Sequence, residues 1–161
     1  VKAMEWYQKA AAAGDGDAVY NIGFLYANEP GSIDYQKAME WYNKAAATGN
    51  TDAMSNIGWM YEKGETGSVD YAIAMKWYQK AAAAGNGTAM NNIGWMYESG
   101  EGVKKDYKKA MEWYNKAALS GNADALNNIA LLYEEGKGVK KDMEKAAEWY
   151  KKSGEAKSQL E

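Results

Sequence analysis

Four large apolar side chains recur in the sequence at intervals of 35 and 36 residues, and they could bind a partner. They are Phe24, Trp59, Trp95 and Leu131, called here the predicted strip. At about 100° per residue of helix, Trp95 lies about 160° from Ile93 and Tyr97, away from the apolar stripe of its own helix. Exposed aromatic side chains of this kind are typical of binding sites. The alternative is that they pack against a neighbouring helix as part of the core.

Polar residues on the same helical face would complete a peptide-binding site. Amides and hydroxyls lie one turn before the strip, where they could bind a peptide backbone. Glu62, Glu98 and Glu134 lie about one turn after it, where they would favour Lys or Arg, and Ala27 has the corresponding position in the first repeat. The candidate peptide-binding residues are Tyr20, Phe24, Ser55, Trp59, Glu62, Asn91, Trp95, Glu98, Asn127, Leu131 and Glu134. Asn56 and Asn128 are instead expected to make structural hydrogen bonds to an adjacent loop.

Residue types that perform catalysis are scarce. The chain has no His and no Cys, so the commonest general base, the thiol nucleophile and the thiolate metal ligand are missing. The segments GEG (100–102) and GKG (136–138) resemble phosphate-binding loops, but they follow a helix and lack the Gly-Lys-Ser/Thr context. Adjacent carboxylates such as Glu134 and Glu135 point in different directions on a helix. We therefore expect no enzyme activity, no cofactor and no metal site.

Composition narrows the class of partner. The chain has 161 residues, 47% of them hydrophobic, and a formal net charge of -3. It can therefore bury a core, and its charge argues against binding to nucleic acid, which usually requires a basic face. No run of about 18 apolar residues is present, so no membrane insertion is expected. We expect a monomer. Without cysteines the sequence does not indicate a compartment.

Internal repetition organises the whole chain. The dipeptide WY recurs with spacings of 35, 36, 36 and 36 residues, at 6–7, 41–42, 77–78, 113–114 and 149–150. Each unit has two helical patterns, separated by a Gly-rich segment and an Asp suited to an N-cap. The sequence thus predicts an all-α solenoid of about nine helices in antiparallel pairs. The predicted parts are a lone second helix (1–14), four repeats (15–49, 50–85, 86–121 and 122–154) and a C-terminal tail (155–161).

Both ends of the chain suggest that it was cut from a longer protein. An unpaired second helix at the start leads us to expect a further repeat upstream, and Leu160–Glu161 resembles a cloning remnant.

Two further residue types carry packing expectations. Gly23, Gly58 and Gly94 recur inside helices, where each costs about 1 kcal/mol against Ala, so we expect close helix contact there. The tryptophans of the WY dipeptides fall on the buried stripe of the second helices, and we expect them in the core. They are Trp6, Trp41, Trp77, Trp113 and Trp149.

The repeated residues resemble the Sel-1-like repeat, a relative of the tetratricopeptide repeat. The third unit matches the family pattern at Ala89, Ile93, Gly94, Tyr97, Gly100, Gly102, Val103, Asp106, Ala110, Trp113, Tyr114, Ala117, Ala118 and Gly121. The resemblance implies a right-handed superhelix whose first helices line a concave surface. It also implies an adaptor or scaffold in protein complexes, mostly bacterial or of the endoplasmic reticulum. It names no partner.

We therefore interpret the chain as a protein- or peptide-binding adaptor whose partner carries basic and apolar side chains. Carbohydrate or cell-wall binding is the alternative, with Trp59 and Trp95 stacking on sugar rings. A structural spacer or an engineered array is a third possibility, although the uneven loops favour a natural origin.

Overall fold

The computed structural model describes residues 2–158, which form nine helices and no strand. The helices are α1 (Lys2–Ala12), α2 (Gly16–Asn28), α3 (Tyr35–Ala47), α4 (Thr51–Lys63), α5 (Tyr71–Ala83), α6 (Gly87–Ser99), α7 (Tyr107–Leu119), α8 (Ala123–Glu135) and α9 (Met143–Ser158). This confirms the predicted all-α class. The predicted cloning remnant, Leu160–Glu161, lies outside the described residues.

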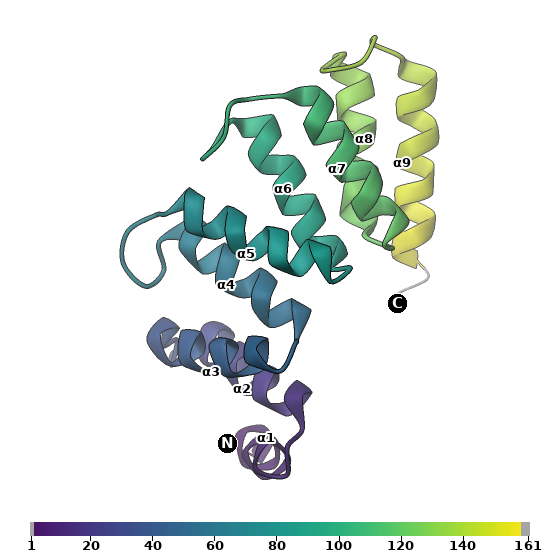
Figure 1. Ribbon diagram of the computed structural model, residues 1–161. Helices are drawn as coiled ribbons and strands as arrows, with labels where there is room; N and C mark the ends of the chain where they lie inside the picture. The colour runs from purple at the N-terminus through teal and green to yellow at the C-terminus, as the bar shows by residue number, and fades with distance from the viewer. Residues whose placement is uncertain (1, 159–161) are drawn as a thin grey trace. The chain divides into compact units, whose positions relative to one another are not determined.

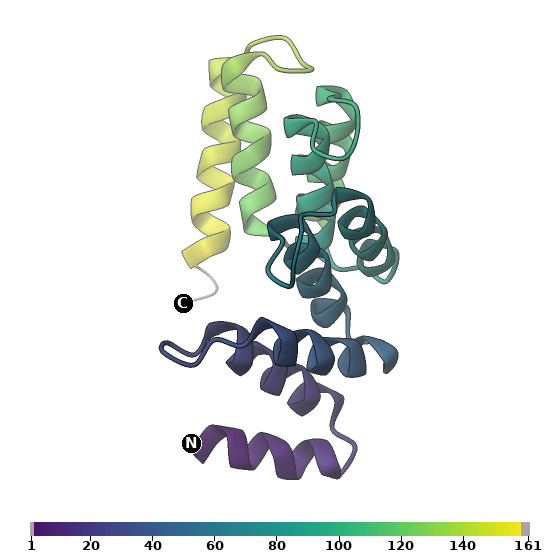
Figure 2. The same ribbon diagram turned by 90° about the vertical axis from the view of Figure 1, so that its left-hand side faces the viewer.

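The helices pack in sequential antiparallel pairs within two compact units. The division falls between Ala84 and Gly85, so that α1–α5 belong to the first unit and α6–α9 to the second. The pairs are α2 with α3 and α4 with α5 in the first unit, and α6 with α7 and α8 with α9 in the second. α8 and α9 lie side by side in both views (Figure 1; Figure 2). Each pair corresponds to one repeat, with a first and a second helix.

Short polar side chains and glycines fix where the helices begin and end. Asp34, Asp70 and Asp106 accept backbone hydrogen bonds at the starts of α3, α5 and α7, as the sequence predicted. Gly64 and Gly100 end α4 and α6 with positive φ angles. Residues 155–158, predicted as part of a tail, continue α9.

The glycines inside the first helices allow a tyrosine of the second helix to approach closely. A Cβ placed on Gly58 would lie 2.7 Å from the Tyr78 ring, and one on Gly94 would lie 2.6 Å from the Tyr114 ring. Both tyrosine side chains are fully buried. Ala130 replaces the glycine in the fourth repeat, and the matching Tyr150 is partly exposed. The predicted close contact is therefore confirmed.

The expectation that the WY tryptophans belong to the core is wrong for Trp6 and holds only in part for the other four, of which Trp149 packs against the core cluster of the second unit. Trp6 is 71% exposed, and its four counterparts are only partly buried. Lysine ammonium groups lie over their rings, for example Lys44 at 4.3 Å from the Trp41 centroid and Lys116 at 4.2 Å from that of Trp113. In the first three repeats, Tyr42, Tyr78 and Tyr114 fill the space against the glycine, which leaves the tryptophan before each of them at the edge of the helix pair.

Candidate functional site

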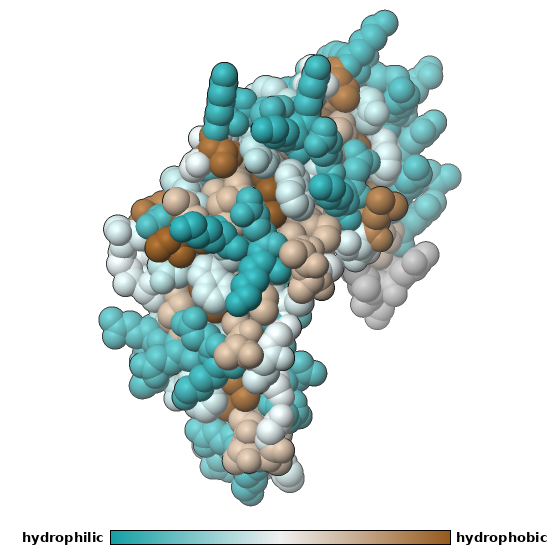
Figure 3. Space-filling model, in the orientation of Figure 1, coloured by the Kyte–Doolittle hydropathy of each residue, from teal (hydrophilic) through white to brown (hydrophobic). Residues whose placement is uncertain are grey.

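Three members of the predicted strip are open to solvent. Phe24 on α2 is 46% exposed, and Trp59 on α4 and Leu131 on α8 are each 37% exposed. Trp95 on α6 is partly buried and packs against the core cluster of the second unit. On the face shown in Figure 3, strongly hydrophobic side chains reach the surface in several separate places among hydrophilic ones. Phe24, Trp59 and Leu131 are therefore exposed, as predicted for the strip, whereas Trp95 also contributes to core packing.

The carboxylates beside the strip have internal partners. Glu62, Glu98 and Glu134 accept hydrogen bonds from the tyrosine hydroxyls of the paired second helices. The hydroxyl-to-carboxylate distances are 2.8 Å from Tyr78, 2.7 Å from Tyr114 and 2.6 Å from Tyr150. Glu62 is only 6% exposed and also pairs with Lys63 at 2.6 Å. The expectation of an open acidic rim is therefore wrong at Glu62. At Glu98 and Glu134 the carboxylates make hydrogen bonds that join the two helices of a repeat.

The register of the repeat explains these tyrosine–glutamate pairs. Each glutamate follows the close-contact position by four residues, so both lie on the face that meets the second helix. The tyrosine ring crosses the small residue, and its hydroxyl then reaches the carboxylate. Burial and the Glu98 bond raise the pKa of Tyr114. The Glu134 bond, followed by burial, raises the pKa of Tyr150 to about 12.

The predicted polar residues divide between structural bonds and the surface. The Asn56 amide donates to the Tyr20 hydroxyl at 3.3 Å, and the Asn128 amide donates to the Asn91 side chain at 2.9 Å. Asn56 and Asn128 are structural as expected, but their partners lie on the preceding first helix and not on a loop. Ser55 is buried, contrary to its predicted place on an open face, whereas Asn127 is partly exposed.

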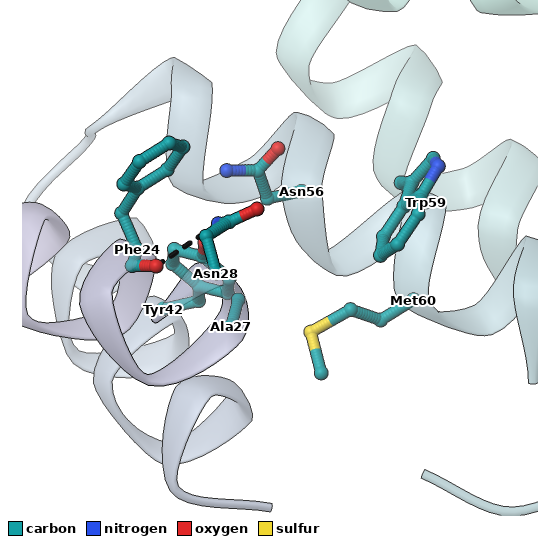
Figure 4. A pocket seen from close by; sticks show the side chains of 7 residues that line it. All are labelled: Phe24, Ala27, Asn28, Tyr42, Asn56, Trp59 and Met60. Atoms are coloured by element: carbon teal, nitrogen blue, oxygen red, sulfur yellow. Dashed lines mark hydrogen bonds between the residues drawn. The ribbon is translucent and has the colours of Figure 1, made fainter. Parts of the chain in front are cut away.

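A pocket of about 180 Å³ opens in the first unit, where α2, α3 and α4 meet. Its lining residues are Phe24, Ala27, Asn28, Tyr42, Asn56, Trp59 and Met60. In Figure 4, Phe24 and Asn28 lie on one side and Trp59 and Met60 on the other. Two exposed strip residues thus border a single opening. This pocket was not predicted from the sequence, where its signal is Ala27 at a position that is Glu in the other repeats.

The pocket combines aromatic walls with amide and hydroxyl groups. Tyr42 is 2% exposed, and its ring centroid lies 5.7 Å from that of Tyr20. Burial, and after it the neighbouring Tyr20, raise the pKa of Tyr42, whereas a hydrogen bond with Asn56 lowers it. The Asn28 amide donates to the Phe24 carbonyl at 2.9 Å. Apolar surface with a few placed polar groups is typical of ligand-binding pockets.

Residues 2–158 contain neither a cluster of metal ligands nor a membrane-spanning helix. In that range no group of three or more acidic side chains is arranged to hold a metal ion. None of the helices described there is long and apolar enough to cross a bilayer.

The Sel1 repeat model matches the chain in five segments, at residues 1–15, 16–50, 51–86, 87–122 and 123–158. The matched repeats begin one residue later than the predicted ones. No curated protein matches the sequence.

Several solved structures are similar. A Sel1 repeat protein from Oxalobacter formigenes is 37% identical with a TM-score of 0.84, over 94% of this chain and 62% of that one. The protective antigen c5321 of uropathogenic Escherichia coli strains, which displays an SLR fold, is 39% identical with a TM-score of 0.81, over 95% of this chain and 33% of that one. This chain therefore spans less than two thirds of either protein's length. The immunity protein Pa5087 from Pseudomonas aeruginosa, 20% identical with a TM-score of 0.59 over 95% and 73%, shares the fold.

Proposed function

Since the chain belongs to the Sel1 repeat family, we propose that it is a scaffold that binds a protein or peptide through its first helices. The observation that carries the proposal is the pair of exposed aromatic residues, Phe24 and Trp59, that border one pocket in the first unit. Large exposed aromatic side chains beside a pocket are favoured anchors for binding. The names of the similar structures, an antigen and an immunity protein, agree with a role in recognition.

The chemistry of the partner is mainly apolar in this proposal. The predicted preference for Lys and Arg depended on three glutamates that, in the structure, accept hydrogen bonds from tyrosine hydroxyls. We therefore propose that apolar groups of the partner contact Phe24 and Trp59, and we do not retain a basic preference. Asn28 and Asn56, which also line the pocket, provide amide groups for the neighbouring peptide backbone.

Selection from a random peptide library displayed on phage, followed by affinity measurement, tests the proposal. Trp59→Ala should weaken the selected peptide about tenfold or more, because aromatic anchors dominate such interfaces. Trp6→Ala is the matched control, since Trp6 is exposed but does not line this pocket. An equal loss of affinity in both variants, or the selection of no peptide, would contradict the proposal. Binding to a glycan array in the absence of peptide binding would also contradict it and favour the carbohydrate alternative.

A further inference from the structure

Three of the four repeats contain a complete set of a small residue, a tyrosine and a glutamate. In the second repeat these are Gly58, Tyr78 and Glu62, and in the third they are Gly94, Tyr114 and Glu98. The fourth repeat keeps the tyrosine–glutamate bond with Ala130 as the small residue. In these three repeats the tyrosine hydroxyl of the second helix therefore donates a hydrogen bond to a carboxylate of the first helix.

The first repeat keeps two parts of the set and lacks the third. A Cβ on Gly23 would lie 2.8 Å from the Tyr42 ring, so the ring is placed as in the other repeats. The residue four positions after Gly23 is Ala27, which has no carboxylate to offer. The pocket of about 180 Å³ lies at this place, and both Ala27 and Tyr42 line it. This volume is several times the roughly 30 Å³ of a water molecule.

The pocket lining suits a carboxylate. Its polar residues are Asn28, Asn56 and Tyr42, and no acidic side chain lines it. The Asn56 amide already acts as a donor toward Tyr20 and lowers the pKa of Tyr42, as a donor would. An amide donor does not replace the carboxylate acceptor that the other repeats supply.

We propose that this pocket binds a glutamate side chain of the partner. The carboxylate of that glutamate accepts a hydrogen bond from the Tyr42 hydroxyl and so replaces the glutamate that the first repeat lacks. Phe24 and Trp59 contact the methylenes of that glutamate and the apolar residues beside it. The inference rests on the proposed function, because it names the residue that the peptide-binding surface selects. Glutamate is preferred because the internal acceptors in the other three repeats are all glutamates.

The test uses blocked tripeptides, acetylated and amidated so that they have no terminal carboxylate. Leu-Glu-Leu and Leu-Gln-Leu are titrated into the full chain while NMR follows the Trp59 indole and the Asn56 amide. Leu-Glu-Leu should bind about tenfold or more tightly than Leu-Gln-Leu, since a hydrogen bond to a charged group exceeds one to a neutral group. A third peptide, Leu-Leu with a free C-terminus, shows whether a terminal carboxylate serves equally well, and binding as tight as that of Leu-Glu-Leu would overturn the choice of glutamate.

Two variants with a matched control decide where the carboxylate binds. Tyr42→Phe should lower the affinity for Leu-Glu-Leu to that for Leu-Gln-Leu, and Ala27→Glu should abolish binding by filling the pocket. Tyr114→Phe should leave both affinities unchanged, because that hydroxyl is bonded to Glu98. Equal binding of the two blocked peptides at Trp59 would overturn this inference and leave the proposed function standing. Absence of any shift with all three peptides would overturn the inference as well, and the library selection would then decide the proposed function separately.

Discussion

The first and third repeats share a glycine–tyrosine contact between their two helices, but only the third has a carboxylate that accepts the tyrosine hydroxyl's hydrogen bond. In both, a tyrosine of the second helix lies against a glycine of the first, at Gly23–Tyr42 and at Gly94–Tyr114. In the third repeat Glu98 accepts the hydroxyl, whereas in the first repeat Ala27 leaves a pocket between two exposed aromatic residues. We infer from this difference that the side chain four residues after the glycine determines whether a repeat has a carboxylate acceptor for its tyrosine or an open pocket.

The glycine–tyrosine contact, which the second repeat also has at Gly58 and Tyr78, should be the most sensitive to change. Gly58→Leu forces a side chain into the Tyr78 ring, which lies 2.7 Å from the position of a Cβ. We expect the free energy of unfolding to fall by about 1–3 kcal/mol, as is typical of overpacking. Denaturant unfolding measures it. Gly154→Ala is the control, since nothing lies within 4 Å of a Cβ there, and its stability should stay the same or rise slightly. Equal stability of both variants would contradict the claim that the close helix contact requires a glycine at position 58.

Opening the third repeat should destabilise the chain almost as much. Glu98→Ala leaves the buried Tyr114 hydroxyl without its carboxylate, at a cost of about 1–3 kcal/mol. Glu112→Ala, at an exposed position on the second helix, should change stability by less than about 0.5 kcal/mol. Thermal melting of the two variants checks the difference. If they melted together, the tyrosine–glutamate bond would contribute nothing to the fold.

Filling the first repeat should have the opposite sign. Ala27→Glu supplies the missing acceptor for Tyr42, and we expect a gain of about 1 kcal/mol in the free energy of unfolding. The double variant Ala27→Glu/Tyr42→Phe should lose that gain, because the two changes are coupled through one hydrogen bond. An equal gain with and without the tyrosine hydroxyl would assign it to packing alone.

Alkaline pH should produce the smallest difference, through the partly exposed pair of the fourth repeat. The Tyr150 pKa of about 12 in the folded chain lies above the ordinary value of about 10. Its contribution to stability is therefore complete below about pH 10 and is lost as pH rises toward about 12, because the unfolded chain ionises first. Tyr150→Phe should show a shallower fall of melting temperature across this range. Parallel curves for the two proteins would contradict the raised pKa.

Periodicity in the sequence was sufficient to predict the helices, their aspartate caps and the exposure of Phe24, Trp59 and Leu131. It overestimated the burial of the WY tryptophans and failed at Glu62, because a helical wheel gives the direction of a side chain but not which side chains of the paired helix contact it. Tyr78 donates a hydrogen bond to Glu62, and lysine side chains such as Lys80 lie over the tryptophan rings. The pocket required a comparison between repeats, in which Ala27 stands against three glutamates.

The crystal structure of the Ala27→Glu variant tests most directly whether position 27 decides between a filled and an open repeat. We predict that the new carboxylate lies within hydrogen-bonding distance of the Tyr42 hydroxyl, as Glu98 does with Tyr114 at 2.7 Å, and that the pocket between Phe24 and Trp59 closes. A carboxylate turned out to solvent above an unchanged pocket would contradict the account.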